Sequence, residues 1–184
     1  MESILMFLKD NKDAFSSFGT IVALSLFLFA FHQYRRAESW KKSEFIAKLY
    51  KDFIDDADCQ RAMWMLDWKD RPINFGSEER PIVKDYTWDI LFAALRKHEK
   101  KPFSDREMRI RDTFDRFFSF IEQFERAMQN NLVGQEQVYP YFAYWIELLA
   151  GKRHLTDPYR SRVLEYIDEY GFNDVKRFLD RWPK

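Results

Sequence analysis

One long apolar run near the start of the chain is the strongest constraint on how this protein folds. The run FSSFGTIVALSLFLFAF extends from Phe15 to Phe31, and no later segment is comparably apolar. A helix rises ~1.5 Å per residue, so the run with its flanking residues reaches roughly the ~30 Å of a hydrocarbon core. We therefore predict a transmembrane helix over residues 14–34.

A signal peptide and a buried core helix are the two alternatives to a membrane span. A cleaved signal peptide is disfavoured because no small-x-small cleavage site follows the apolar core, and Arg35 and Arg36 come directly after it. A buried core helix is the stronger rival, because helices that are apolar all round also occur inside globular proteins. The polar chain that follows favours the membrane span over the core helix.

Charged residues on either side of the run predict its orientation. Acidic and basic residues alternate before the run, whereas basic residues accumulate after it. The residues expected at the membrane interface are Arg35, Arg36, Trp40, Lys41 and Lys42. Because cytoplasmic flanks carry the excess of Lys and Arg, residues 1–13 are expected outside and the C-terminal bulk in the cytoplasm, below the cell's inner or plasma membrane. The same cations could bind anionic lipid headgroups, although orientation alone accounts for them.

Small residues within the run could allow two such helices to associate. Ser16, Gly19, Ala23 and Ala30 fall near one helical face, and small side chains let membrane helices approach closely. Phe27 interrupts this stripe, so a chance distribution of small residues accounts for it equally well. Self-association, or association with another membrane or cytosolic protein, is one expectation.

The rest of the chain suffices for one compact domain. The formal net charge is +0 with 33% charged residues, which argues against a general nucleic-acid binder, because phosphate binding needs an excess of Lys and Arg. Aromatic residues make up 18% of the chain and predict a core rich in rings. The single cysteine, Cys59, cannot build a disulfide framework and suits a reducing compartment.

Hydrophobic periodicity predicts a mostly α fold in which the transmembrane helix continues into a stalk, residues 35–56, and then a cytosolic helical domain, residues 57–184. Ser104 and Glu107 form the clearest helix start in the chain, a capping box. The predicted helices cover 57–67, 87–97, 104–130, 135–150, 157–171 and 174–182, with Asn173 as the cap of the last one. Because Pro140 lies early in the fourth of these, that helix either starts at Pro140 or is bent there. A small β-hairpin or a folded loop is expected where two short β-favouring stretches, Ile73–Phe75 and Ile82–Val83, flank Gly76 and Ser77.

Several short motifs give the chain a familiar outline. They are WKKSEFIAKLY after the apolar run, LDW at Leu66–Trp68, IRDTFDRFF at Ile110–Phe118, FE at Phe124 and Glu125, PYFAYW at Pro140–Trp145 and YGF at Tyr170–Phe172. With these motifs the chain resembles uncharacterised bacterial single-span membrane proteins with a helical cytosolic domain of unknown function. The resemblance implies a single span and a helical domain, and it implies no activity for particular residues.

Acidic residues on the predicted central helix are the only candidates for metal or acid–base chemistry. Asp112, Asp115, Glu122 and Glu125 share this helix with Arg111, Arg116 and Arg126. A di-metal bundle site also needs Glu-x-x-His pairs, and no histidine of the chain follows a glutamate by three positions. An ion-pair network is therefore favoured, and no metal, cofactor or catalytic residue is assigned. Phosphate-binding loops and CxxC pairs are also missing, so an enzyme is the less favoured class.

Two short basic loops are the candidates for binding an anionic small ligand. The first contains Arg96, Lys97, His98, Lys100 and Lys101, and the second Lys152, Arg153 and His154. Converging loops of this kind would form an anion site. Solvated loops at helix ends, where cations complement the helix dipole, are the simpler interpretation.

These observations predict a membrane-anchored cytosolic module that works by binding, as an adaptor, sensor or assembly subunit, without catalysis. The alternative is a ligand-gated membrane effector, in bacterial defence for example, that senses an anionic nucleotide through the basic loops.

Overall fold

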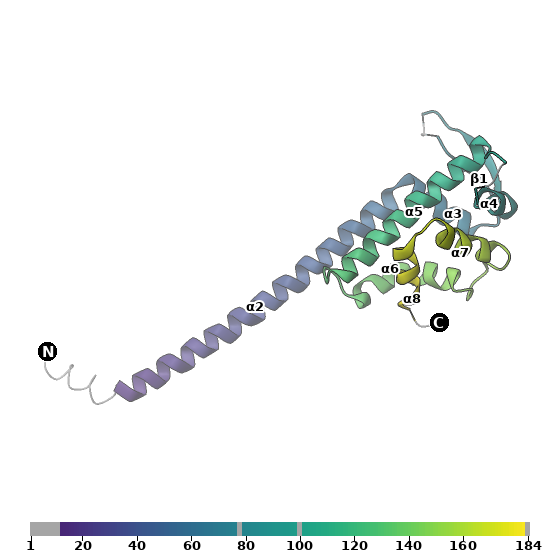
Figure 1. Cartoon of the computed structure of the whole chain (residues 1–184). Coiled ribbons are helices and arrows are strands. Elements are labelled where there is room, and N and C mark those ends of the chain that lie inside the picture. The colour runs from purple at the N-terminus through teal and green to yellow at the C-terminus, as the bar shows by residue number, and fades with distance from the viewer. Residues whose placement is uncertain (1–11, 77–78, 99–100, 183–184) are drawn as a thin grey trace. The chain divides into compact units, whose positions relative to one another are not determined.

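The computed structural model of the protein describes residues 12–76, 79–98 and 101–182, and for residues 12–18 the backbone alone. The described part is mostly helical with one small antiparallel hairpin, which confirms the predicted fold class at that level (Figure 1). The elements are α2 (Lys12–Asp55), α3 (Ala57–Asp67), β1 (Asp70–Asn74), β2 (Val83–Thr87), α4 (Trp88–Ala94), α5 (Asp105–Gln129), α6 (Gln135–Leu149), α7 (Tyr159–Glu169) and α8 (Asn173–Asp180).

The chain divides into two compact units, Met1–Glu44 and Phe45–Lys184. The described residues of the first unit all belong to α2. The last part of α2, residues 45–55, belongs to the second unit together with every later element. As the absence of Gly and Pro predicts, the helix runs without a break through residues 35–55.

The first unit leaves its apolar side chains exposed. The large apolar residues with exposed side chains are Ile21, Val22, Leu24, Leu26, Phe27, Leu28, Phe29 and Phe31. The predicted transmembrane helix is nevertheless not found among the described residues, since none of their helices has the length and hydropathy of a membrane span. From Gly19, the first residue whose side chain is described, an 18-residue stretch already includes Arg35 and Arg36. The side chains of residues 14–18 and the predicted outer segment 1–13 lie outside the described part.

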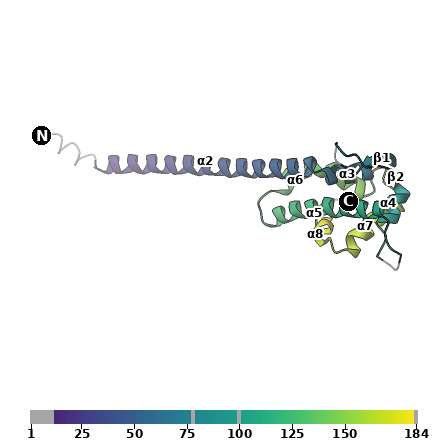
Figure 2. The ribbon, with the colours of Figure 1, turned by 90° about the horizontal axis from the view of Figure 1, so that it is seen from above.

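The second unit is organised around α5, the long central helix. Its start has the predicted capping box: Ser104 Oγ accepts a hydrogen bond from the Glu107 amide at 3.3 Å, and the Glu107 carboxylate accepts one from the Ser104 amide at 2.7 Å. Partial burial pushes the pKa of Glu107 upward, but the hydrogen bonds from Ser104 and the charge of Arg96 bring the pKa below its ordinary value. The capped helix packs against α3, α4 and α8, and both views show α8 beside it (Figures 1 and 2).

A cluster of phenylalanine rings joins the end of α2 to the core of the second unit. Phe53 on α2 is fully buried, and its ring centroid lies 5.7 Å from that of Phe117, 6.1 Å from that of Phe124 and 5.3 Å from that of Phe142. Phe124 and Phe142 are themselves 4.6 Å apart and edge to face, an arrangement that aromatic quadrupoles favour. The end of α2, α5 and α6 are therefore held together by one continuous ring cluster.

The hairpin is longer than the sequence predicts, and its strands are shifted. β1 begins at Asp70 and includes Pro72, which pairs with Asp85 on β2. Proline donates no ladder hydrogen bond, but each strand of a two-stranded sheet has an open edge at which the missing donor has no effect. The hairpin is fixed to α3 because the Tyr86 hydroxyl and the Trp88 indole both donate to the buried Met65 carbonyl, at 2.7 and 3.1 Å.

Helix termini in the last third differ in detail from the sequence prediction. α6 begins at Gln135 and carries Pro140 inside it, so the helix does not start at the proline. Gly151 and Gly171 adopt the left-handed φ values of +77° and +75° that end α6 and α7, as predicted. The predicted cap at Asn173 is wrong: Asn173 is the first residue of α8, and its amide donates to the Gly171 carbonyl at 2.7 Å, which tightens the turn.

Candidate functional site

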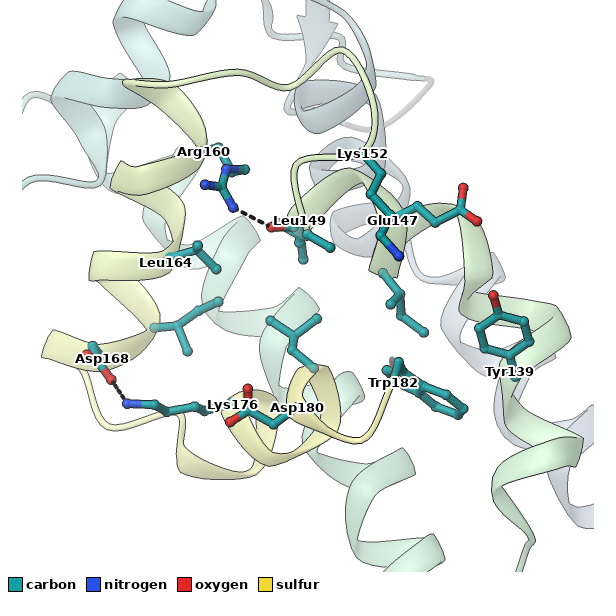
Figure 3. Close-up of a pocket in the computed structure, with 14 residues that line it drawn as sticks. Tyr139, Glu147, Leu149, Lys152, Arg160, Leu164, Asp168, Lys176, Asp180 and Trp182 are labelled. Carbon is teal, nitrogen blue, oxygen red and sulfur yellow. Dashed lines mark hydrogen bonds and ion pairs between the residues drawn. The ribbon is translucent and has the colours of Figure 1, made fainter. Parts of the chain in front are cut away.

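A pocket of about 380 Å³ lies between α6, α7 and α8 in the second unit (Figure 3). Its volume falls within the range of sites that bind small molecules. The apolar lining comes from all three helices and consists of Ile146, Leu149, Ala150, Leu164, Ile167 and Leu179. Of the lining residues, only Lys152 is among the candidate binding residues predicted from the sequence, so this pocket is the main site that the fold adds.

Charged side chains of both signs surround the apolar lining. They are Glu147, Lys152, Arg160, Asp168, Lys176 and Asp180. Glu147 forms an ion pair at 2.7 Å with Arg153, which lies outside the pocket lining. Lys176 forms an ion pair at 2.6 Å with Asp168. The hydrogen bond to Asp168 is the main cause that raises the pKa of Lys176, and the charge of Asp180 adds to it.

Arg160 is held beside the end of α6 by a backbone carbonyl and a nearby carboxylate. Its Nη1 donates to the carbonyl of Leu149 at 3.3 Å, near the end of α6 (Figure 3). Its Nε lies 3.7 Å from the Asp157 carboxylate. Gly151 leaves room for this side chain, because a Cβ at that position would lie 3.2 Å from the guanidinium carbon. The glycine that ends α6 therefore also makes space for the pocket's arginine.

Trp182 lines the pocket just after α8 and is 5% exposed. Its ring packs between Tyr139 and Phe178, with centroid distances of 5.1 and 5.7 Å. Within the described residues the buried indole Nε1 has no hydrogen-bond partner. A buried donor without an acceptor costs about 1 to 3 kcal/mol.

In the first predicted basic loop, the guanidinium of Arg96 makes contacts within the fold. The Arg96 guanidinium lies 3.9 Å from the Phe103 ring centroid and donates to the carbonyl of Pro102 and to the carboxylate of Glu107. The His98 amide donates to the Tyr170 hydroxyl at 2.9 Å. Lys97 is exposed, as is Lys101, whose carbonyl accepts a hydrogen bond from Arg96. Lys100 lies outside the described residues.

The second basic loop has different partners. Besides its ion pair with Glu147, Arg153 lies over the ring of Tyr144 at 4.3 Å. His154 approaches the backbone carbonyl of Asp67 at 2.7 Å through Nε2 and stacks on the Trp88 ring. Lys152 lines the pocket between α6, α7 and α8. The two loops thus have separate sets of partners, and a shared anion site formed by them stays a prediction.

Glu122 and Glu125 of α5 form ion pairs, as the sequence indicates, whereas the side chain of Asp112 is exposed. Fully buried Glu125 is bound by Arg181 at 2.6 Å. Glu122 pairs with Arg126 at 3.2 Å, and Arg126 also reaches Asp174 at 3.0 Å. These pairs link α5 to α8 and to the residue that follows it.

Asp115, also on α5, accepts a hydrogen bond from the Tyr166 hydroxyl of α7 at 2.6 Å. Burial raises the pKa of Asp115 more than this hydrogen bond and the charge of Arg111 lower it. Within the described part of the chain, no group of three or more Asp, Glu, His and Cys side chains is arranged to hold a metal ion. Cys59 is fully buried, and burial raises the pKa of its thiol far above the ordinary range, which makes it a poor nucleophile.

The interface residues predicted in α2 lie within the first unit. Arg35 is placed over the Phe31 ring at 5.0 Å, and Lys42 pairs with Glu38 at 3.2 Å. Trp40 is 73% exposed, and Arg36 and Lys41 are exposed as well.

The small residues predicted to associate lie on the same part of α2. A Cβ at Gly19 would meet nothing within 4 Å, and Ala23 and Ala30 are exposed. The side chain of Ser16 lies outside the described residues. Their role in association stays a prediction.

The pocket does leave one signal in the sequence. Arg160, Leu164 and Asp168 recur at every fourth position and so share one face of α7, where they line the pocket together. Which other helices cover that face is not encoded in the spacing.

Comparison with known protein families, curated proteins and solved structures finds no match for this chain. The resemblance suggested by the short motifs therefore stays a prediction.

Proposed function

We propose that this protein is a membrane-anchored module that works by binding, with the apolar segment of α2 in the bilayer and the helical unit in the cytoplasm. The observation that carries the proposal is the run of exposed apolar side chains from Ile21 to Phe31. Contiguous apolar surface of this kind is rare on a protein facing water and marks a surface covered by lipid or by protein. Lipid surrounds a helix on all sides, so it suits a helix that is apolar all round better than a protein that contacts one side would.

The flanking residues support the bilayer as the environment. Arg35 and Arg36 lie about one turn after the last apolar side chain, Phe31, and exposed Trp40 lies one turn further along the helix. Aromatic residues and cations at the end of an apolar helix anchor it at the headgroup level, and their positive charge favours the cytoplasmic side. The N-terminus is then outside the cell.

The second unit supports a binding role. It offers a pocket with an apolar lining and charged groups, the usual form of a ligand site. Two of the acidic residues on its central helix, Glu122 and Glu125, are engaged in ion pairs with Arg126 and Arg181. We therefore propose an adaptor, sensor or assembly subunit in which the helical unit meets its ligand or partner at the membrane surface.

Alkaline carbonate extraction of cell membranes tests the anchor. The wild-type chain is expected to stay in the membrane pellet. The double substitution Leu24→Arg with Leu28→Arg is expected to release it, because each arginine in mid-membrane costs about 2.5 to 3.5 kcal/mol on insertion scales. Gln33→Arg, at the edge of the segment, is the matched control and should stay in the pellet.

Two outcomes would contradict the anchor: release of the wild-type chain by carbonate, or retention of the double-arginine variant. Thermal unfolding of each variant, followed by its helical circular dichroism, tests whether the helical unit is still folded. Protease added outside intact cells should remove an N-terminal tag and leave a C-terminal tag intact.

Crosslinking of the intact protein in mild detergent tests the binding role. An adaptor or assembly subunit should be recovered with a second copy or another protein attached. Recovery of the monomer alone, under conditions that crosslink a known membrane dimer, would argue against association.

A further inference from the structure

We propose that the pocket between α6, α7 and α8 binds a small amphipathic carboxylate, a molecule with a compact apolar body and one negatively charged head. This inference goes beyond the proposed function and does not depend on the insertion of α2 into a membrane. It rests on the lining of the pocket and on the pairing of its charges.

The lining selects the apolar body. Leu164 and Ile167 come from α7, Leu149 from α6 and Leu179 from α8, and together they leave a space of about 380 Å³. This volume is near the lower end of small-molecule sites, so it suits a body of roughly two fused rings. A ligand without apolar surface would gain little from these side chains.

Arg160 selects the negative head. One of its Nη atoms and its Nε face the Leu149 carbonyl and Asp157, and the second of these contacts is loose at 3.7 Å. Asp157 is already engaged by the Ser161 amide, which donates to it at 3.2 Å. Figure 3 shows Arg160 and Lys152 near the connection between α6 and α7, on the opposite side of the pocket from Lys176 and Asp180. A carboxylate at this end can accept charge-assisted hydrogen bonds.

The other charges limit the head to a single negative charge. The charge of Glu147 is neutralised by Arg153. At the α8 end, the ammonium of Lys176 forms an ion pair with Asp168 and also interacts electrostatically with Asp180, so one positive charge faces two carboxylates. That end therefore carries an excess of negative charge. A nucleoside triphosphate, with several charges spread along its length, would be repelled there, whereas an apolar body with its single charge near Arg160 would not.

Isothermal titration of the full-length protein in lipid nanodiscs tests the proposal, with empty nanodiscs as the blank. The probe is 2-naphthoate, and its uncharged comparator is 2-naphthalenemethanol. The carboxylate should bind roughly tenfold tighter than the alcohol, as expected for charge-assisted hydrogen bonds to a partly buried guanidinium. ATP should not displace the bound 2-naphthoate.

Two variants and one control connect this binding to the pocket. Arg160→Gln should make the affinities for the carboxylate and the alcohol about equal, and continued binding of the alcohol shows that the pocket is still formed. Leu164→Trp, which fills the space, should weaken both probes at least tenfold. Leu132→Trp, at an exposed position outside the pocket, should leave both affinities unchanged.

The proposal is overturned if the wild-type protein shows no preference for the carboxylate, if Leu164→Trp binds as the wild type does, or if ATP competes. None of these results bears on the membrane anchor, because carbonate extraction of the same variants measures separately whether α2 holds the chain in the membrane. Conversely, release of the chain by carbonate would leave the titration result standing.

Discussion

The carboxylate of Glu125 on α5 receives two hydrogen bonds from Arg181, whose Nε and Nη2 each lie 2.6 Å from one of its oxygens. Glu125 is fully buried, and Gln129 donates a third hydrogen bond to it at 2.8 Å. A bidentate pair of this kind satisfies a charge that could not otherwise be buried. It ties the C-terminal end of the chain to the central helix.

Removing one partner of this pair should be costly. Arg181→Ala leaves the Glu125 charge buried without its counterion, so we expect a loss of about 3 to 5 kcal/mol in the free energy of unfolding, measured with urea. Lys51→Ala is the control, since its pair with Asp55 is exposed and is worth about 0 to 1 kcal/mol. A loss for Arg181→Ala no larger than that of the control would show that Glu125 is not buried as described.

Acidification should weaken the contact of α5 with α8 through Asp174. Burial pushes the pKa of this carboxyl upward, but hydrogen bonds from Arg177, Arg126 and Gln129 hold it below its ordinary value. A carboxyl with a lowered folded-state pKa stabilises the fold fully above its unfolded-state pKa, and the contribution is lost as the pH falls through the folded-state value. Wild type should therefore exceed Asp174→Asn in stability at pH 7, and the difference should shrink towards pH 3.

Urea unfolding of both proteins at the two pH values measures this difference. Asp70→Asn is the matched control, because Asp70 is exposed on β1 and is not among the residues that bind Asp174. A difference between wild type and Asp174→Asn that is the same at both pH values would contradict the lowered pKa.

The Met65 carbonyl should show non-additive behaviour because it accepts from both Tyr86 and Trp88. Tyr86→Phe alone should cost about 0.5 to 1.5 kcal/mol, since the indole still satisfies the carbonyl. With Trp88→Phe added, the buried carbonyl loses both donors, so the double variant should lose more than the sum of the two single losses. Strict additivity in a double-mutant cycle would mean that the two donors do not share this acceptor.

The end of α2 should contribute to the core of the second unit. Phe53→Ala removes a fully buried ring from the phenylalanine cluster, and we expect a loss of about 3 to 5 kcal/mol in unfolding free energy. Phe45→Ala, two turns earlier and 40% exposed, should change it by less than about 1 kcal/mol. Equal effects of the two substitutions in thermal or urea unfolding would place Phe53 outside the core.

Local chemistry determines which parts of the fold can be predicted from the sequence. The start of α5 follows from Ser104 and Glu107, because the cap is formed within four residues. Its long apolar stripe marks the central helix, and Gly151 and Gly171 mark helix ends, since few other residues adopt positive φ. The shifted hairpin shows where prediction from the sequence fails. Pro72 argues against a strand unless the strand lies at the edge of a sheet, and only the tertiary structure decides whether it does.

The candidate site could not be predicted in the same way. Its residues come from three helices between Tyr139 and Trp182, and their meeting depends on how α6, α7 and α8 pack. Clusters of basic residues are the more visible pattern along the chain, but the fold engages two of these residues, Arg96 and Arg153, in internal contacts. Pairs distant in sequence, such as Glu125 with Arg181, have no periodic signature.

The position of Phe53 has a practical consequence for dissecting this protein. A fragment cut at the end of α2 would lack Ile46 and Phe53, two buried side chains of its own core. The second unit begins at Phe45, so an expression fragment or a proteolytic product that preserves the fold must retain the last three turns of that helix. Limited proteolysis should therefore generate a stable product by cutting before this point, and not at the turn after Asp55 where the chain first changes direction.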